Sequence, residues 1–341
     1  MRVLSIFSGI GGLDLAAEWA GMEPAAFCEI EPFPVEVLKK RFPDVPIFGD
    51  VRKLKRGDID GTIDIIHGGF PCQDLSQAGK QAGLEGARSG LWFEMLRVIS
   101  EFRPRYVVAE NVRGAVNLAL DTVYSNLVNE GYKVYPYVIS ASAVGAPHQR
   151  ERLFVVGVRE DVANSACERL QRSLAKEGFE CGGESGRFMA VEGSGAGLWP
   201  TPRANKIGGS TSEGYGLCLQ EAVNGGRDTK LWPTPTGTER SGINPNTGSG
   251  AGLSKVNGGQ LNPDWVEQLM NFPEGWTDLD VDEPKPWQGW PALLGQEQYP
   301  YEFPRTTTCC KDRAKRLKAL GNAVVPAQAY PFFKAIMEVE G

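Results

Sequence analysis

The sequence predicts an α/β protein with a doubly wound, mostly parallel sheet and a smaller, irregular domain. Over residues 1–160, short apolar runs alternate with amphipathic stretches of helical length, which is the pattern of parallel strands joined by crossover helices. The composition of the sequence then changes. Residues 178–259 hold 20 of the chain's 42 glycines and few periodic apolar runs. Such a stretch is too rich in loops for a sheet core.

The expected elements follow one another in regular order. Val3–Phe7 is a candidate buried strand, and a glycine turn leads from it into a helix at Leu13–Ala20. Further strands are expected at Ala25–Glu29, Ile63–His67, Tyr106–Glu110 and Leu153–Val158, with helices at Pro34–Phe42 and Leu91–Phe102. Strands alternating with helices of this length indicate a doubly wound sheet.

Three segments are expected along the chain: a sheet domain at 1–160, an irregular region at 161–304, and a C-terminal segment at 305–341. In the last, a basic helix at Cys310–Leu320 precedes an apolar helix at Ala327–Val339, which we expect to pack back on the sheet. The string LWPTP occurs at Leu198–Pro202 and again at Leu231–Pro235. Two copies fall short of a repeat architecture.

Composition narrows the class of protein. No apolar run approaches the roughly 18 residues that a membrane span needs, and the N-terminus does not resemble a signal peptide, so we expect a cytoplasmic protein. The two histidines and seven cysteines show no metal-ligand spacing, and no metal site is expected. The net charge of −6 argues mildly against a nucleic-acid partner, although basic residues gather near 150–159 and 305–318.

A glycine-rich turn after the first strand is a candidate ligand site. In Phe7–Gly21 a strand ends in glycines and opens into a helix, so the backbone can approach a ligand at the helix N-terminus. Glu29 and Asp50 end the next two strands. Their carboxylates can accept hydrogen bonds from a ribose or, at Asp50, from an adenine amino group. Taken alone, the glycines are more typical of ordinary turn chemistry, and the two acids of solvated loop carboxylates.

Cys72 lies where open α/β sheets hold their active sites. The strand expected at 63–67 leads into Pro71 and Cys72 at its carboxyl end. A polar, glycine-rich stretch follows and is long enough to close over a substrate. A deprotonated cysteine here suits nucleophilic attack, although an isolated cysteine is more often a small buried hydrophobe.

Six short motifs occur in an order that resembles the DNA (cytosine-5) methyltransferase family, of prokaryotic or phage type. They are Phe7–Gly12 for the glycine motif, Pro71-Cys72-Gln73 for Pro-Cys-Gln, Glu110-Asn111-Val112 for Glu-Asn-Val, Arg150 and Arg152 for Arg-x-Arg, Leu261–Pro273 for the late Leu-x-Pro…Gly-Phe-Pro motif, and Gly321–Val324 for Gly-Asn-x-Val. Each string alone matches by chance often enough, but ordered agreement of six is hard to attribute to chance.

The resemblance implies a fold and an activity. It implies the S-adenosylmethionine-dependent methyltransferase fold, with residues 1–160 as catalytic and cofactor-binding domain and residues 161–304 as target-recognition region. The implied reaction transfers a methyl group from S-adenosyl-L-methionine to carbon 5 of a cytosine that is flipped out of a specific short sequence in double-stranded DNA. A monomer that serves a restriction-modification system is also implied.

The resemblance also implies roles for individual residues. Cys72 would attack carbon 6 of the base, Glu110 with a raised pKa would protonate N3, Arg152 and Arg150 would contact the base carbonyl or a phosphate, and Asn111 would hold the adjoining loop. The cofactor would be bound by Phe7, Gly9, Gly11, Glu29, Ile30, Asp50, Pro71, Leu91 and Asn322.

Some positions depart from the family pattern, and other functions remain open. His148 stands where the family usually has glutamine, Asp264 replaces an arginine, and Asn271 replaces a glycine. The stretch between Pro273 and Gly321 is longer than in compact relatives and has the character of an insertion. The alternatives are a tRNA cytosine-5 methyltransferase, a catalytically inactive DNA-binding regulator and, from the glycine turn alone, an NAD-dependent dehydrogenase.

Overall fold

The computed structural model describes residues 1–71, 90–117, 119–176, 190–191, 231–232, 234–235 and 260–340. The expected nucleophile Cys72 and the first LWPTP copy at Leu198–Pro202 lie outside the described residues. Most of the expected recognition region also lies outside them.

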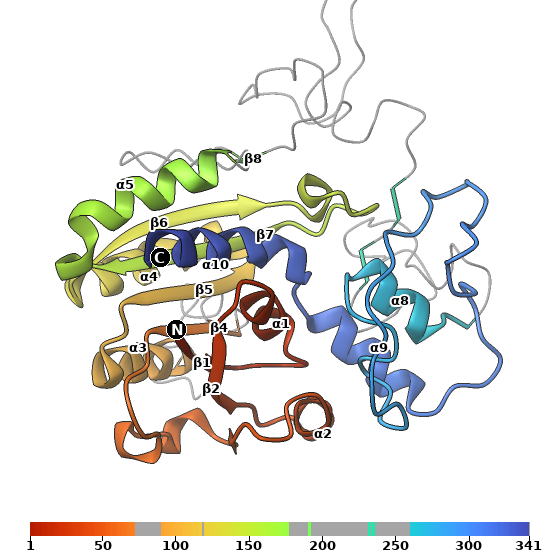
Figure 1. The fold of residues 1–341 in the computed structure, drawn as a ribbon, viewed down its shortest axis with the longest axis horizontal. Coiled ribbons are helices and arrows are strands. Elements are labelled where there is room, and N and C mark those ends of the chain that lie inside the picture. The colour runs from red at the N-terminus through yellow and green to blue at the C-terminus, as the bar shows by residue number, and fades with distance from the viewer. Residues whose placement is uncertain are drawn as a thin grey trace, which may run out of the picture.

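A single eight-stranded sheet organises the described residues (Figure 1). Its strands are β1 (Arg2–Ile6), β2 (Glu23–Cys28), β3 (Ile47–Phe48), β4 (Ile65–Gly69), β5 (Tyr106–Val112), β6 (Tyr132–Ile139), β7 (Arg152–Arg159) and β8 (Ala190–Val191). The spatial order is β3-β2-β1-β4-β5-β7-β6-β8. β1 to β5 run parallel, and β7 is antiparallel to both of its neighbours. The expected doubly wound, mostly parallel sheet is confirmed.

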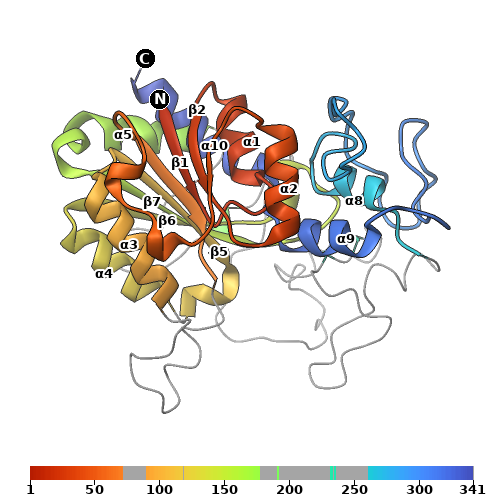
Figure 2. The same ribbon diagram turned by 90° about the horizontal axis from the view of Figure 1, so that it is seen from below.

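The described part of the chain also forms helices, some on the two faces of this sheet and some beside it. They are α1 (Gly12–Trp19), α2 (Pro32–Arg41), α3 (Gly90–Phe102), α4 (Leu120–Asn129), α5 (Glu160–Lys176), α8 (Pro263–Leu269), α9 (Arg313–Asn322) and α10 (Pro326–Glu340). Short 3₁₀ turns are η1 (Val51–Lys53), η2 (Arg56–Asp58), η3 (Arg113–Asn117) and η4 (Ala141–Val144). α1, α5 and α10 lie on one face and α3 and α4 on the other, as Figures 1 and 2 show from two sides.

The strands are largely apolar because both sheet faces are buried. Neighbouring residues on one strand enter different cores: Ile65 packs under α1 and α10, whereas Ile66 packs under α3 and α4. At the carboxyl end of β4 the chain changes to glycine. A Cβ atom at Gly68 would lie only 2.2 Å from the backbone oxygen of Ile6, so the close approach of β1 and β4 requires glycine there.

Four elements of the sheet layer were not expected from the sequence: α4, β6, α5 and β8. α5 begins at Glu160 and packs against β6, β7 and α10, so the sheet layer continues to Lys176, past the boundary expected at residue 160. The helix expected near the C-terminus corresponds to α10, which packs against α1 and α5.

A second lobe lies beside the carboxyl ends of the strands. α8, α9 and the loops of residues 270–312 form it in the described part of the chain (Figures 1 and 2). Its apolar core joins Trp265, Leu269 and Phe272 to Leu38 and Phe42 around α2. The lobe is therefore packed directly on the part of the sheet domain that carries the glycine turn.

Candidate active site

A cavity of about 750 Å³ opens at the carboxyl ends of the parallel strands. Its lining includes most of the residues expected to bind a cofactor: Phe7, Gly9, Glu29, Ile30, Asp50, Pro71, Leu91 and Asn322. The expected catalytic residue Glu110 lines the same cavity. Residues from the first strand to the last forty positions of the chain are thus brought to one site.

The glycine turn has an unusual backbone that opens one side of the cavity. Phe7 and Gly9 have φ of 55° and 56°, and Gly11 has φ of 81°, a region that favours glycine. The Phe7 N–H donates to the backbone oxygen of Cys28 at 2.8 Å. Gly11, unlike the other expected residues, is not in the lining. It caps α1, and a Cβ there would lie 3.2 Å from the Phe42 ring, so its role is a tight turn against α2.

Glu29 is the buried carboxylate at the end of β2. Its oxygens accept the backbone N–H groups of Gly9 at 2.7 Å and of Ile30 and Glu31 at 2.8 Å each. Burial raises the pKa of Glu29, while these three hydrogen bonds act in the opposite direction. A carboxylate has about four acceptor positions, so one remains for a hydroxyl group in the cavity.

The adjoining wall holds Ile30, Asp50 and Cys28. The Ile30 side chain is 63% exposed, although it is apolar, so a flat ring in the cavity can pack on it. Asp50 accepts from Arg52 Nε at 2.9 Å, and this hydrogen bond lowers its pKa. Burial, with Glu29 and Asp50 adding to it, raises the pKa of Cys28 to about 12. Cys28 therefore stays a thiol and is no rival nucleophile.

Glu110 lies near the carboxyl end of β5, opposite Gly69 of β4. Its Oε1 pairs with Arg152 Nε at 2.8 Å, and both side chains are nearly buried, at 13% and 12% exposure. Burial raises the pKa of Glu110, and the Arg152 guanidinium opposes that rise. The site thus contains a carboxyl group that retains a proton more readily than an exposed one. Arg152 also donates to the Glu151 backbone oxygen.

Asn111 holds the segment that leads to position 72. Its Nδ2 donates to the Phe70 backbone oxygen at 2.9 Å, and its Oδ1 accepts the Val112 N–H at 2.8 Å. The side chain is 4% exposed and does not line the cavity. These contacts are compatible with the loop-holding role predicted for Asn111.

Arg150 does not reach the cavity. It is 3% exposed, and its guanidinium donates to the backbone oxygens of Pro235 and Gly321 at 2.8 Å each and to that of Ala323. Arg150 therefore joins the second LWPTP copy to the turn between α9 and α10, which lines the cavity. We correct the expected base or phosphate contact to a positioning role, because these carbonyls surround the charge.

Among the cavity residues that the sequence did not single out are Cys28 and Gly69, and Trp276, which supports the cavity from outside, was not predicted either. Gly69 lies within a glycine pair before Pro71, so that motif offered a signal for it. Trp276 donates from its indole nitrogen to the Ile10 backbone oxygen at 2.8 Å. These two residues are 266 positions apart in the sequence, and no local pattern reveals such a contact.

Comparison with known proteins identifies a family. A profile described as C-5 cytosine-specific DNA methylase matches residues 1–185. The chain is 38% identical over 168 residues to the Type II methyltransferase M.Eco47II of Escherichia coli, covering 48% of this chain and 40% of that protein. It is 40% identical over 167 residues to M.NgoFVII of Neisseria gonorrhoeae, covering 47% and 44%. The match therefore spans less than half the length of either relative.

Solved structures show a likeness over nearly the whole chain. Spodoptera frugiperda DNMT2, as a triple mutant, has a TM-score of 0.58 at 16% identity and covers 98% of this chain and 99% of that one. The Entamoeba histolytica methyltransferase EhMeth has a TM-score of 0.57 at 13% identity, with 100% and 99% covered. At these identities the likeness shows the fold, and it confirms the methyltransferase fold that the motifs implied. Since the profile matches 185 of 341 residues, the chain belongs to the C-5 cytosine-specific DNA methylase family.

Proposed function

We propose that this protein transfers a methyl group from S-adenosylmethionine to carbon 5 of cytosine in a specific sequence of double-stranded DNA. One observation carries the proposal. Glu110, whose pKa burial raises, lines the same cavity as the glycine turn and as Pro71, the residue directly before Cys72. Glu110, the proposed cofactor site and the end of the strand that leads to Cys72 therefore meet at one edge of the sheet.

The described residues fit the cofactor. A cavity of about 750 Å³ is within the roughly 300–1,000 Å³ typical of small-molecule sites. Glu29 has an acceptor position for a ribose hydroxyl, exposed Ile30 offers an apolar surface to adenine, and Asp50 offers a carboxylate to its amino group. Leu91 and Asn322 close the other walls. When bound, S-adenosylmethionine supplies an electrophilic methyl group.

The chain's own residues must make cytosine carbon 5 nucleophilic. In the proposed sequence, the Cys72 thiolate bonds to carbon 6 while Glu110 gives a proton to N3, and the ring becomes an enamine whose carbon 5 accepts the methyl group. A base then removes the carbon 5 proton. The carbon–sulfur bond breaks with its electrons returning to Cys72, and N3 returns its proton to Glu110. A raised pKa at Glu110 favours the form that donates.

Arg152 fits two tasks in this sequence. Its contact with Glu110 Oε1 at 2.8 Å orients the carboxyl group. In the proposed sequence its charge, held beside Glu110, would stabilise negative charge that develops on the ring. Because Arg152 contacts Oε1, Glu110 would donate its proton to N3 from Oε2. Because that oxygen lies next to Gly69, the width of the site at this point depends on glycine.

The partner and the setting also belong to this proposal. The relatives named as Type II methyltransferases support action on duplex DNA within a restriction-modification system. We propose a monomer in the cytoplasm. Among the described residues no helix is long and apolar enough to span a membrane, and no cluster of three metal-binding side chains occurs in them. Residues 161–304 would supply the contacts that read the target sequence.

A methyl-transfer assay tests this function directly. Purified protein and labelled S-adenosylmethionine are incubated with unmethylated genomic DNA and, in parallel, with tRNA, and the modified base is identified and located by sequencing. We expect 5-methylcytosine at one short motif and none with Cys72→Ala. A Cys309→Ala variant is the matched control, because Cys309 is an exposed free thiol that does not line the cavity. Label in RNA alone, or no label with a folded protein that binds the cofactor, would refute the proposal in favour of a tRNA enzyme or an inactive regulator.

A further inference from the structure

Trp276 links the second lobe to the glycine turn. Its ring is 6% exposed, and its Nε1 donates to the backbone oxygen of Ile10 at 2.8 Å. A Cβ at Gly11 would lie 3.7 Å from Trp276 Cζ2, so the ring also covers that residue. Ile10 itself lines the cavity. A single side chain from the second lobe thus contacts two consecutive residues of the turn.

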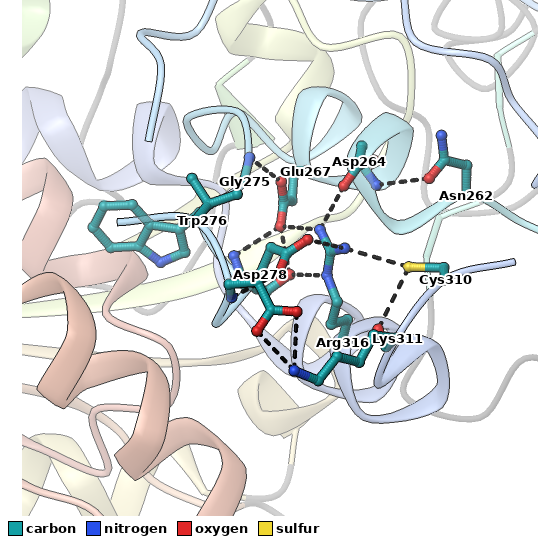
Figure 3. Close-up of polar contacts among 12 residues, drawn as sticks. Asn262, Asp264, Glu267, Gly275, Trp276, Asp278, Cys310, Lys311 and Arg316 are labelled. Carbon is teal, nitrogen blue, oxygen red and sulfur yellow. Dashed lines mark hydrogen bonds and ion pairs between the residues drawn. The ribbon is translucent and has the colours of Figure 1, made fainter. Parts of the chain in front are cut away.

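The loop that carries Trp276 is fixed by a buried carboxylate. Glu267 of α8 is fully buried and accepts the N–H groups of Gly275 at 2.7 Å and Thr277 at 2.8 Å, one on each side of Trp276. It also accepts the Thr277 hydroxyl. Trp276 therefore protrudes from a loop whose two flanking amides share one anchor (Figure 3).

Arg316 of α9 compensates the charge of that anchor. Its Nη2 contacts Glu267 Oε1 at 2.8 Å and Asp264 Oδ1 at 2.6 Å, and its Nε donates to Thr277 Oγ1 at 2.8 Å. In Figure 3 these groups converge, while the Trp276 ring points away from them toward the N-terminal part of the chain. Asp264 stands where the family usually has arginine, so this arrangement depends on one of the positions that departs from the family pattern.

A second arginine, in the sheet domain, forms hydrogen bonds to the same loop. Arg41, the last residue of α2, donates to the backbone oxygens of Trp276 at 2.8 Å, Gly275 at 2.6 Å, Asp278 at 2.7 Å and Val281 at 2.8 Å. Its guanidinium carbon lies 5.9 Å from the centre of the Trp276 ring. The loop is therefore clamped between α2 and α9.

We propose that Trp276 is a positioning residue for cofactor binding, which holds the glycine turn in the conformation that accepts S-adenosylmethionine. In this turn Phe7, which is not a glycine, has φ of 55°, and a backbone strained in this way persists only when its surroundings fix it. The Trp276 indole fixes it from outside the cavity, without touching the cofactor. The second lobe, through α8 and α9, thereby supports the cofactor site as well as the proposed recognition of DNA.

This inference rests on the proposed function, and calorimetric binding of S-adenosylhomocysteine separates the two. Trp276→Phe keeps an aromatic ring but leaves the buried Ile10 carbonyl without its donor, and we expect its Kd to rise about fivefold to tenfold. Arg41→Lys keeps the charge but loses most of the hydrogen bonds to the backbone oxygens of the loop, and we expect its Kd to rise less, by about threefold. This second variant keeps the test valid should Trp276→Phe fold poorly.

Trp287→Phe is the matched control. Trp287 also donates its indole N–H to a backbone oxygen of the second lobe, that of Gln268 at 3.0 Å, but it does not line the cavity. Its Kd is expected to equal that of the wild type. Hydrogen exchange of the ligand-free protein gives a readout independent of binding: amides of residues 7–15 should exchange faster in Trp276→Phe and not in Trp287→Phe.

Each outcome bears on one idea. Wild-type affinity and unchanged exchange in both Trp276→Phe and Arg41→Lys would overturn the positioning role of Trp276 and leave the proposed function standing. An equal loss in Trp287→Phe would also overturn it, because the effect would then be general to the lobe. A wild-type protein that does not bind S-adenosylhomocysteine would overturn the proposed function, and the positioning role with it.

Discussion

Replacing Gly69 by alanine should move Glu110 without unfolding the protein. A Cβ at Gly69 would lie 2.7 Å from Glu110 Oε2, well inside ordinary van der Waals contact. The clashing atom is the far end of a flexible side chain, so the carboxyl group can swing away at little cost in stability. The Arg152 contact on the other oxygen, at 2.8 Å, limits where it can go.

The size of the effect follows from the displacement. Oε2 must retreat by about 0.5 Å or more, which is the tolerance usually quoted for a productive site, and a misplacement of about 1 Å can lower a rate roughly 100-fold. We therefore expect the single-turnover rate of methyl transfer to fall about tenfold to 100-fold, or roughly 1.4–2.7 kcal/mol in the barrier. The free energy of unfolding should change by less than about 1 kcal/mol.

Rapid-quench assays at saturating S-adenosylmethionine and DNA, with thermal unfolding in parallel, make this measurement. Gly57→Ala is the control, because a Cβ there meets nothing within 4 Å. Gly68→Ala gives the opposite pattern, since its Cβ would meet the Ile6 backbone oxygen at 2.2 Å and should destabilise the sheet. A Gly69→Ala protein with the wild-type rate would refute the role given to Glu110.

Three further predictions concern charged and polar side chains of the site. Glu110→Gln should lower the rate of methyl transfer by at least about 100-fold. Burial raises the pKa of Glu110, and the protonated form is the one that acts. The wild-type rate should therefore fall as pH rises through that pKa, and the variant should not show this decrease. Arg150→Met leaves three backbone oxygens without their donor and should reduce the free energy of unfolding by about 3 kcal/mol in denaturant titrations. Burial lowers the pKa of His148 to about 3. Between about pH 6.5 and that value the unfolded chain therefore binds a proton on this histidine that the folded chain does not. The free energy of unfolding should fall with falling pH by up to about 1.4 kcal/mol per pH unit, and His148→Gln should remove this pH dependence.

Most of the sheet could be predicted because its strands are apolar and end in recognisable turns. β6 was missed although it is central to the antiparallel part. Pro136 interrupts it, and proline within an apolar run argues against a strand. Here Pro136 lies opposite Val155 of β7 in a register that the strand keeps. α5 was missed because its sequence lies at the point where the apolar pattern of the first domain fades.

Site residues that belong to short motifs could be predicted, whereas their surroundings could not. The positions of Glu29, Asp50 and Glu110 follow from strand ends, which meet at one edge of a parallel sheet. The burial of Arg150 depends on Pro235 and Gly321, which are distant in sequence. No pattern of residues 148–152 distinguishes a guanidinium that faces a ligand from one that faces backbone oxygens.

The basic segment at 305–318 illustrates the same limit. It reads as a surface that could meet DNA, yet Arg316 is 1% exposed. Lys311 pairs with Asp280 at 2.7 Å and Lys315 with Asp312 at 2.8 Å. The carboxylates that neutralise this basic segment come partly from the stretch after Pro273. Charge runs are usually solvated or paired, and only the fold tells which.

Covalent trapping tests the central claim most directly. A duplex carrying 5-fluorocytosine at the target position has no carbon 5 proton to lose, so the carbon–sulfur bond formed before methyl transfer cannot be released. We predict a protein–DNA complex that survives denaturing electrophoresis, requires S-adenosylmethionine, and is absent with Cys72→Ala. A complex that persists in Cys72→Ala, or methylation of cytosine without any trapped complex, would contradict the account.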